Sequence, residues 1–160
     1  MKKQPVYFAG IFLLLSLVTT TGFQSLPPVS SANGEGELSF NGGFQHFAFH
    51  ALKYGDGTVK GSWESKSTGA DDRTHGIITC LTILADGKTA IMSGIITQKD
   101  GTGFPQFTVG DPVWFKVQDN SEGARASVDM FSDYYMGLSG CVDYGITMLP
   151  IENGNIQVKP

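Results

Sequence analysis

The chain is poor in the residues from which most catalytic and metal sites are built. Its 160 residues include only two cysteines and three histidines, and charged residues make up 16% of the sequence. No P-loop, CxxC or HExxH pattern is present. The stretch Gly137–Gly140 resembles a nucleophile elbow, but Cys141 stands where the second glycine of that motif belongs. The sequence therefore indicates no catalytic residue, no metal ligand and no cofactor.

The stretch HGIITC places His75 and Cys80 five residues apart, so a nucleophile with its base has to be considered. The stretch is predicted to be a strand, in which an odd offset places the two side chains on opposite faces and about 16 Å apart. His46 and His50 share one face of their predicted strand, but an offset of four separates them by about 13 Å, too far for one zinc ion. Neither pair is expected to form a site.

Two acidic loops offer oxygen atoms that could suit calcium. They are residues 71–72 and residues 119–122, the second reading Asp-Asn-Ser-Glu. Neither has the spacing of an EF-hand loop, and acidic turns are common in secreted proteins. We therefore expect no metal there.

The amino-terminal segment has the layout of a secretory signal peptide. Lys2 and Lys3 precede an apolar run of about 13 residues, which is shorter than the roughly 20 residues that a membrane span needs. We expect export to the periplasm or beyond the cell, with no membrane span once the signal is removed. The expected parts are a signal peptide at 1–25 with cleavage between 22 and 32, a flexible leader at 26–33, and a single domain at 34–160.

The charge balance argues against two classes of partner. Without the two lysines of the signal segment, nine basic residues face fifteen acidic ones, a net charge of −6. Phosphate neutralisation needs clustered cations, so we expect no nucleic-acid partner. The same reasoning disfavours an anionic membrane surface.

Export also changes how the cysteines are interpreted. Outside the cytosol, Cys80 and Cys141 most simply form a disulfide. The bridge closes a loop of about 60 residues and is worth about 4 kcal/mol on the chain-entropy estimate. The alternative is two buried free thiols.

Short segments rich in β-branched and aromatic residues, separated by glycine turns, predict an all-β fold. We expect about eight antiparallel strands in a mostly meander β-barrel, with a β-sandwich as the alternative. The longest connection, residues 99–111, is the best candidate for a functional loop. The expected strands cover residues 35–40, 44–53, 58–66, 74–84, 89–98, 112–118, 128–135 and 155–159.

An eight-stranded barrel either is filled by its side chains or holds one small ligand. The aromatic side chains that could line a cavity, or could equally be plain core, are Trp63, Trp114, Phe115 and Phe131. The leading hypothesis is an exported, non-enzymatic domain that binds a small apolar ligand, a glycan or a protein. One alternative is a barrel-type cyclase or isomerase with a titratable group in a cavity. Another is a secreted inhibitor or assembly module with a filled barrel, acting through a loop.

Five pieces of the chain together resemble a family of small secreted bacterial all-β domains for which no activity is established. They are GEGELSFNG, FAFHALKYGDGTVKGSW, HGIITCLTILADGKTAIMSGIIT, VWFKVQDNSEG and GNIQV. The resemblance implies a signal peptide and one all-β domain. It implies no activity, since its repeated positions are mostly turn glycines and strand hydrophobes.

Overall fold

The computed structural model describes residues 26–40, 42–121 and 127–160, so the predicted signal peptide lies outside the described residues. The described chain contains ten β-strands and no helix, and therefore no helix that could cross a membrane. The strands are β1 (Pro28–Phe40), β2 (Gly43–Tyr54), β3 (Val59–Ser67), β4 (Asp72–Ile83), β5 (Thr89–Gly101), β6 (Pro112–Gln118), β7 (Met130–Phe131), β8 (Tyr135–Met136), β9 (Leu149–Pro150) and β10 (Asn153–Lys159).

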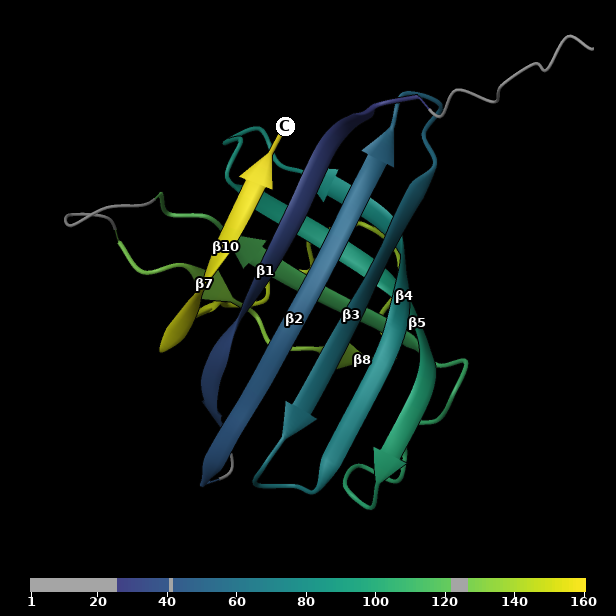
Figure 1. Cartoon of the computed structure of the whole chain (residues 1–160), viewed down its shortest axis with the longest axis vertical. Helices are drawn as coiled ribbons and strands as arrows, with labels where there is room; N and C mark the ends of the chain where they lie inside the picture. Colours follow the sequence, from purple (N-terminus) through teal and green to yellow (C-terminus); the bar gives the residue numbers. More distant parts are fainter. Residues whose placement is uncertain (1–25, 41, 122–126) are drawn as a thin grey trace, which may run out of the picture.

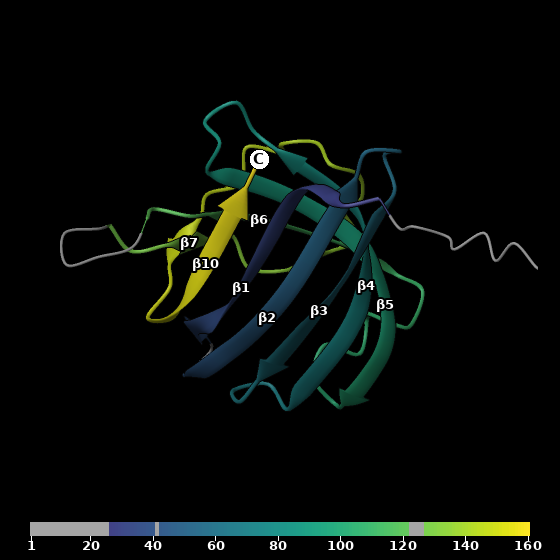
Figure 2. The same cartoon turned by 45° about the horizontal axis from the view of Figure 1, so that its top comes forward.

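All ten strands belong to one strongly curled antiparallel sheet. Its order is β10-β1-β2-β3-β4-β5-β6-β7-β9. Both β7 and β8 pair with β6, β7 near the end of β6 and β8 near its start. Figure 1 shows β10, β1, β2, β3 and the lower lengths of β4 and β5 as a front layer, with the remaining lengths of β4 and β5 crossing behind it together with β6. Figure 2, in which β6 is labelled, shows how the sheet curls between the two layers. The expectation of an all-β, barrel-like meander is confirmed.

Two β-bulges let β4 and β5 pass from the front layer to the rear. The register of this ladder shifts after His75 and again after Ile78, and a bulge bends its strand locally. Because Ile78 and Leu81 both face the core, the second bulge leaves Cys80 on the outer face, where His75 also lies. The prediction of opposite faces was therefore wrong, since strict alternation does not continue through a bulge. Cys80 is bonded to Cys141, so it forms no dyad with His75.

Two aspartates fasten the edge of β10 that does not pair with β1. The carboxylate of Asp129 accepts the backbone N–H of Ile156 at 2.7 Å and that of Asn120 at 2.8 Å. Asp119 accepts the backbone N–H of Val158 at 3.0 Å. Side-chain carboxylates thus take the place of a backbone ladder where the first and last parts of the curled sheet meet.

Aromatic rings fill most of the space between the front and rear layers. Rings from β2 meet rings from the rear layer, and the closest pair is Phe47 and Phe131, with centroids 4.2 Å apart. Such contacts add to the free energy gained by burial. The central aromatic side chains are Phe47, Phe49, Trp63, Phe115, Phe131 and Tyr134.

Glycines on the neighbouring strands make room for these rings. Gly36 lies opposite Phe47 in the β1–β2 ladder, and a Cβ there would approach the Phe47 ring to 2.7 Å. Gly76 lies opposite Trp63 in the β3–β4 ladder, and a Cβ there would approach the indole nitrogen to 2.2 Å. Real side chains do not tolerate such distances, so glycine is required at both positions by packing.

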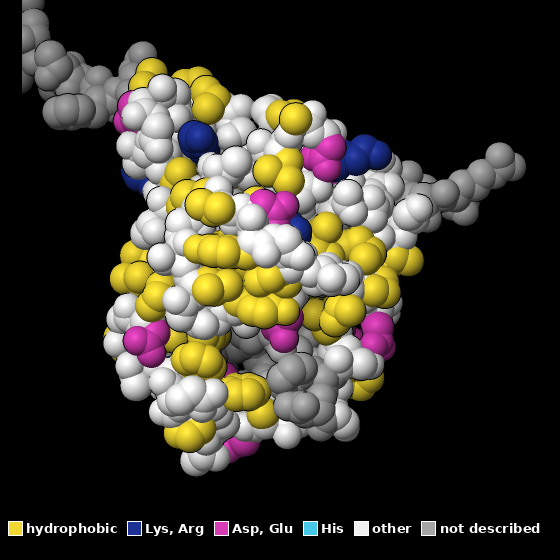
Figure 3. Space-filling view, turned by 180° about the vertical axis from the view of Figure 1, so that it is seen from behind, with side chains coloured by type: hydrophobic (Ala, Val, Ile, Leu, Met, Phe, Trp, Pro, Cys, Tyr) yellow, Lys and Arg dark blue, Asp and Glu magenta, His cyan; other side chains and the backbone are white. Residues whose placement is uncertain are grey.

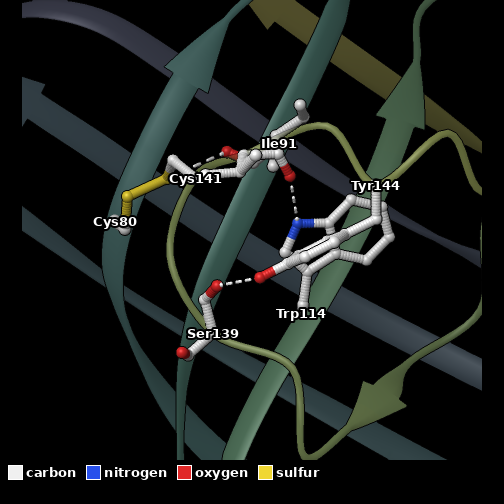
Figure 4. Close-up of a disulfide and its surroundings, with 7 residues drawn as sticks. Cys80, Ile91, Trp114, Ser139, Cys141 and Tyr144 are labelled. Atoms are coloured by element: carbon white, nitrogen blue, oxygen red, sulfur yellow. Dashed lines mark hydrogen bonds between the residues drawn. A yellow bond between two sulfur atoms is a disulfide. The ribbon is translucent and has the colours of Figure 1, made fainter.

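A disulfide holds a long non-strand segment, residues 137–148, against the outer face of the rear layer; we call this segment the strap. Cys141 in the strap is bonded to Cys80 of β4, which confirms the predicted pairing. Figure 4 shows the strap crossing over the strands, with Tyr144 beside Trp114 of β6. The Trp114 indole donates a hydrogen bond to the backbone oxygen of Val142 at 3.0 Å. The bridge therefore fixes a cover over Trp114.

The structure differs from the sequence-based boundaries in two places. The segment expected to be a flexible leader, 26–33, is mostly strand, because β1 begins at Pro28 and residues from Ser31 onward pair with both β2 and β10. The strand expected at 128–135 is broken into β7 and β8, with Asp133 between them at φ +69°. A left-handed residue cannot continue a strand, so the chain turns there.

Candidate functional site

The described part of the interior is hollow at one end, the lower end of the barrel in Figure 1, where the β1–β2 and β3–β4 turns lie. We call this cavity of about 220 Å³ the mouth pocket. Seen from behind, in Figure 3, the lower part of the molecule is hollowed on this side. One wall is polar, formed by Gln45, Ser65, Ser67, Asp72, Thr74, Lys99 and Asp133, and the other is apolar, formed by Phe104, Phe107, Tyr134 and Met136.

Period-two alternation places the polar wall inside the barrel. Ser65 and Ser67 follow Trp63 on the inner face of β3, and Asp72 and Thr74 lie opposite them on β4. All four are buried, with exposed fractions of 8% or less. Buried polar atoms are normally paired, and an unpaired one costs free energy. The hydroxyl of Ser67 has no hydrogen-bond partner among the described residues, so it is free to pair with a ligand.

Lys99 and Asp72 form an ion pair within the polar wall. The lysine ammonium lies 2.6 Å from one carboxylate oxygen of Asp72 and also donates to the backbone oxygen of Gly103. Thr74 donates to the second carboxylate oxygen of Asp72 at 2.9 Å. Both charges are therefore matched, and burying them together costs less than burying either alone.

Asp133 is the carboxyl group of the pocket that has no cation beside it within residues 26–40, 42–121 and 127–160. Its Oδ1 accepts hydrogen bonds from the Gln45 amide and from the backbone N–H of Tyr134, both at 2.6 Å. Burial raises the pKa of Asp133, and these two hydrogen bonds oppose the rise without cancelling it. A carboxyl group perturbed in this way, inside a cavity, is a physical sign of a functional site.

Tyr134 joins the pocket to the aromatic core. Its hydroxyl donates a hydrogen bond to the backbone oxygen of Glu64 at 3.0 Å, and its ring lies 4.7 Å from that of Trp63. Burial raises the pKa of Tyr134 well above its usual value, and the charges of Asp133 and Glu64 raise it further. The hydroxyl therefore stays protonated, and it holds the ring in place as one face of the pocket.

The loop after β5 supplies the rest of the apolar wall. Phe104 and Phe107 lie on one tight turn, in which the Phe107 N–H donates to the Phe104 oxygen at 3.1 Å. The backbone of Asp71 accepts the N–H groups of Thr102 and Gly103 and so anchors the start of the loop. Asp71 and Phe104, like Asp133, have positive φ. Backbone strain of this kind is concentrated at binding and catalytic sites.

A second, larger hollow lies on the outer face of the front layer. This open groove of about 680 Å³ is lined by His50 and His75, while His46 lies beside a smaller hollow next to it. His46 lies 3.0 Å from Glu37, and His75 lies 3.6 Å from Glu64. No group of three or more metal-ligating side chains is found in the described residues. These side chains are ordinary polar residues of a solvent-facing sheet, so we regard the mouth pocket as the site.

The aromatic residues named from the sequence do not gather in the mouth pocket. Trp63, Phe115 and Phe131 belong to the filled core, and Trp114 lies on the opposite side of β6, under the strap. All four are at most 2% exposed. Trp63 backs onto the outer groove, but the burial of its side chain makes it part of the core.

The longest connection predicted from the sequence lies beside the pocket, whereas no sequence pattern predicted the polar wall. The expected functional loop at 99–111 contributes Lys99, Phe104 and Phe107, with β5 running to Gly101 before the loop begins. The acidic stretch 71–72 also reaches the site, through Asp72. No sequence pattern indicated Asp133 or Gln45 as site residues, because their contact depends on two segments that lie far apart in the sequence.

Comparison with protein-family models, with curated proteins and with solved structures found no match to this chain.

Proposed function

We propose that this protein is an exported β-domain that binds one small ligand in the mouth pocket. The observation that carries the proposal is a cavity whose buried polar wall is left incomplete. Among the residues that the structure describes, the Ser67 hydroxyl has no hydrogen-bond partner, and the Asp133 carboxyl is withdrawn from water with no cation beside it. Both costs would be offset by a bound molecule, since ligand sites combine a few placed polar groups with an apolar wall.

The shape of the pocket limits the ligand. A cavity of about 220 Å³ lies below the roughly 300–1,000 Å³ of sites for drug-sized molecules. A polar wall facing Phe104, Phe107 and Met136 suits a molecule with both polar and apolar parts better than a purely apolar one. A glycan or a protein segment would have to use another surface. The rear face offers exposed apolar side chains for a protein, as Figure 3 shows. The exposed apolar side chains of the strap and of β9 include Val142, Tyr144 and Leu149.

Export is supported by the cysteine pair. A disulfide between Cys80 and Cys141 is compatible with an oxidising compartment such as the periplasm or the cell exterior. The basic and apolar pattern of residues 1–25 supports the same location.

A second candidate function is acid–base catalysis on the bound molecule. Burial raises the pKa of Asp133 towards neutral pH, and a general acid or base is most efficient when its pKa lies near the working pH. This candidate requires turnover as well as binding. A ligand recovered chemically unchanged after prolonged incubation with the protein would exclude catalysis and leave the binding proposal intact.

The binding proposal can be tested with a fragment library and two matched variants. Amide chemical shifts of the wild-type protein are recorded by NMR against neutral and charged fragments. Ser67→Met fills the mouth pocket from β3, whereas Ser62→Met places the same side chain in the outer groove from the same strand. We expect shifts at Gln45 and Asp133 in the wild type and in Ser62→Met, and none in Ser67→Met.

Thermal unfolding of both variants establishes that each is folded. Binding that disappears in Ser62→Met but persists in Ser67→Met would move the site to the outer groove. A library without any ligand for the wild-type pocket would show that the proposal is wrong.

A further inference from the structure

We infer that the ligand of the mouth pocket is a small organic cation, held between the Asp133 carboxylate and the aromatic wall. This inference rests on the proposed function, because it names the chemical class that the same pocket selects.

The charges that line the described pocket do not balance. Two carboxylates, Asp72 and Asp133, line it together with one cation, Lys99. Lys99 is committed to Asp72 and to the Gly103 oxygen. Asp133 therefore has no counter-charge, and both of the hydrogen bonds that its side chain accepts in the described chain come from neutral donors. A bound cation would complete the balance.

The geometry of Asp133 leaves one side of its carboxylate for such a cation. The Gln45 amide and the Tyr134 N–H both bind Oδ1. Oδ2 accepts no hydrogen bond from the described side chains of the polar wall. The raised pKa of this group agrees with a carboxylate that is desolvated and lacks a nearby positive charge. An ammonium group close to Oδ2 would favour the charged form.

The aromatic wall provides the second half of the recognition. Phe104, Phe107 and Tyr134 face the cavity, and Met136 completes the wall. Aromatic faces attract organic cations, most strongly where water is excluded, and groups of rings are the usual binding sites of methylated ammonium ions. The Tyr134 ring is already fixed by its hydrogen bond to the Glu64 oxygen, so it loses little freedom on binding.

The Ser67 hydroxyl, which has no partner among the described residues, offers a polar contact on the polar wall, across the pocket from the aromatic rings. It is 5% exposed and lines the pocket. A ligand that carries a hydroxyl group or an N–H beside its charged nitrogen would satisfy this atom. An anion would instead meet two carboxylates and a lysine that is already paired, so anionic ligands are disfavoured.

The test uses pairs of probes that differ in charge but not in shape. Choline is compared with 3,3-dimethylbutan-1-ol, and benzylamine with benzyl alcohol, by calorimetric titration and NMR on the folded protein with its disulfide intact. We expect each cation to bind the wild type about tenfold tighter than its neutral counterpart, with shifts at Gln45 and Asp133. This preference corresponds to about 1.4 kcal/mol.

Asp133→Asn removes the charge and keeps an Oδ1 acceptor for Gln45 and Tyr134. Asparagine also tolerates the positive φ at this position. We expect this variant to lose the tenfold preference for cations, so that each cation and its neutral counterpart bind it with similar affinity. Asp100→Asn, at an exposed carboxylate on the outer face of β5, is the matched control and should retain the preference.

The outcomes separate the inference from the function on which it rests. If neutral probes bind the pocket as tightly as cations, or if Asp133→Asn keeps the preference, the cation inference is wrong while small-ligand binding stands. If neither kind of probe nor any library fragment shifts the pocket amides, the proposed function fails, and the inference fails with it.

Discussion

Removal of the Asp129 carboxylate should weaken the domain more than any other single change at the β10 edge. Asp129 is 7% exposed, and its carboxylate accepts two backbone N–H groups, from Asn120 and from the fully buried Ile156. In Asp129→Ala both donors lose their partner, and water cannot readily reach Ile156. A hydrogen bond to a charged group contributes about 1.5–3 kcal/mol, so the expected loss for the two bonds is about 3–6 kcal/mol.

This magnitude is a large part of the stability of an ordinary domain, which is about 5–15 kcal/mol. Asp119 provides the graded comparison. It accepts one N–H from β10, that of Val158 at 3.0 Å, and one from the exposed Ser121. Because Asp119 is itself only half-buried, water can replace its carboxylate, and Asp119→Ala should cost about 1 kcal/mol.

Urea unfolding of the wild type and the two variants measures the free energies, and equal m-values would show that the unfolded states are comparable. Hydrogen exchange at the amides of Ile156 and Val158 shows whether the edge has opened. A loss below about 1 kcal/mol in Asp129→Ala, or an Ile156 amide as protected as in the wild type, would refute the view that carboxylates close this edge.

Three further predictions address the pocket, the bridge and the core. Burial raises the pKa of Asp133 above its unfolded value, so its contribution to stability is present at low pH and is lost as the pH rises through the folded pKa. Asp133→Asn should therefore raise the melting temperature at pH 8 and give no gain below about pH 4, the ordinary carboxyl range; an equal gain at both pH values would count against a buried charge. Replacing Cys80 and Cys141 by serine opens a loop with a sequence separation of 61 and should cost about 4 kcal/mol in denaturant unfolding, a figure that a wild-type sample unfolded in reductant should reproduce. Gly76→Ala forces a Cβ to 2.2 Å from the Trp63 indole nitrogen and should cost about 1–3 kcal/mol with a red-shifted tryptophan emission; an unchanged emission and stability would show that the ring is not packed there.

The strands with clear alternation could be predicted, and the departures have physical causes. β2 and β6 lie close to their expected positions because apolar residues alternate with polar ones along them. The first residues of β1, with two prolines just before or at its start and two serines, have poor strand propensity. They are ordered because β2 and β10 pair with them on both sides. Pairing by two distant strands is not visible in the local sequence.

The bulge before Cys80 could not be predicted from the local sequence either. A bulge inserts one residue without any required residue type, so the stretch HGIITC reads as an unbroken strand. The mouth pocket could not be predicted either, because the rule that alternating polar side chains face solvent does not hold at this end of the barrel. Ser65, Ser67, Asp72 and Thr74 alternate as an outward polar face would, yet they point inward next to Trp63. Only the register of β3 against β4 shows that they share the barrel interior.

The cost of keeping Asp133 buried connects stability with the proposed binding. Burial disfavours the charged form of Asp133, which has no cation beside it in the described chain, and the positive φ of the same residue adds strain. The surrounding structure does not require this charge, since the two hydrogen bonds that Asp133 accepts reach Oδ1 and an asparagine could accept both. A group that weakens the fold and is replaceable within it is best explained by what it binds. Asp133→Asn should therefore do two opposite things, stabilising the protein at neutral pH and abolishing its preference for cations, a combination that a purely structural role would not produce.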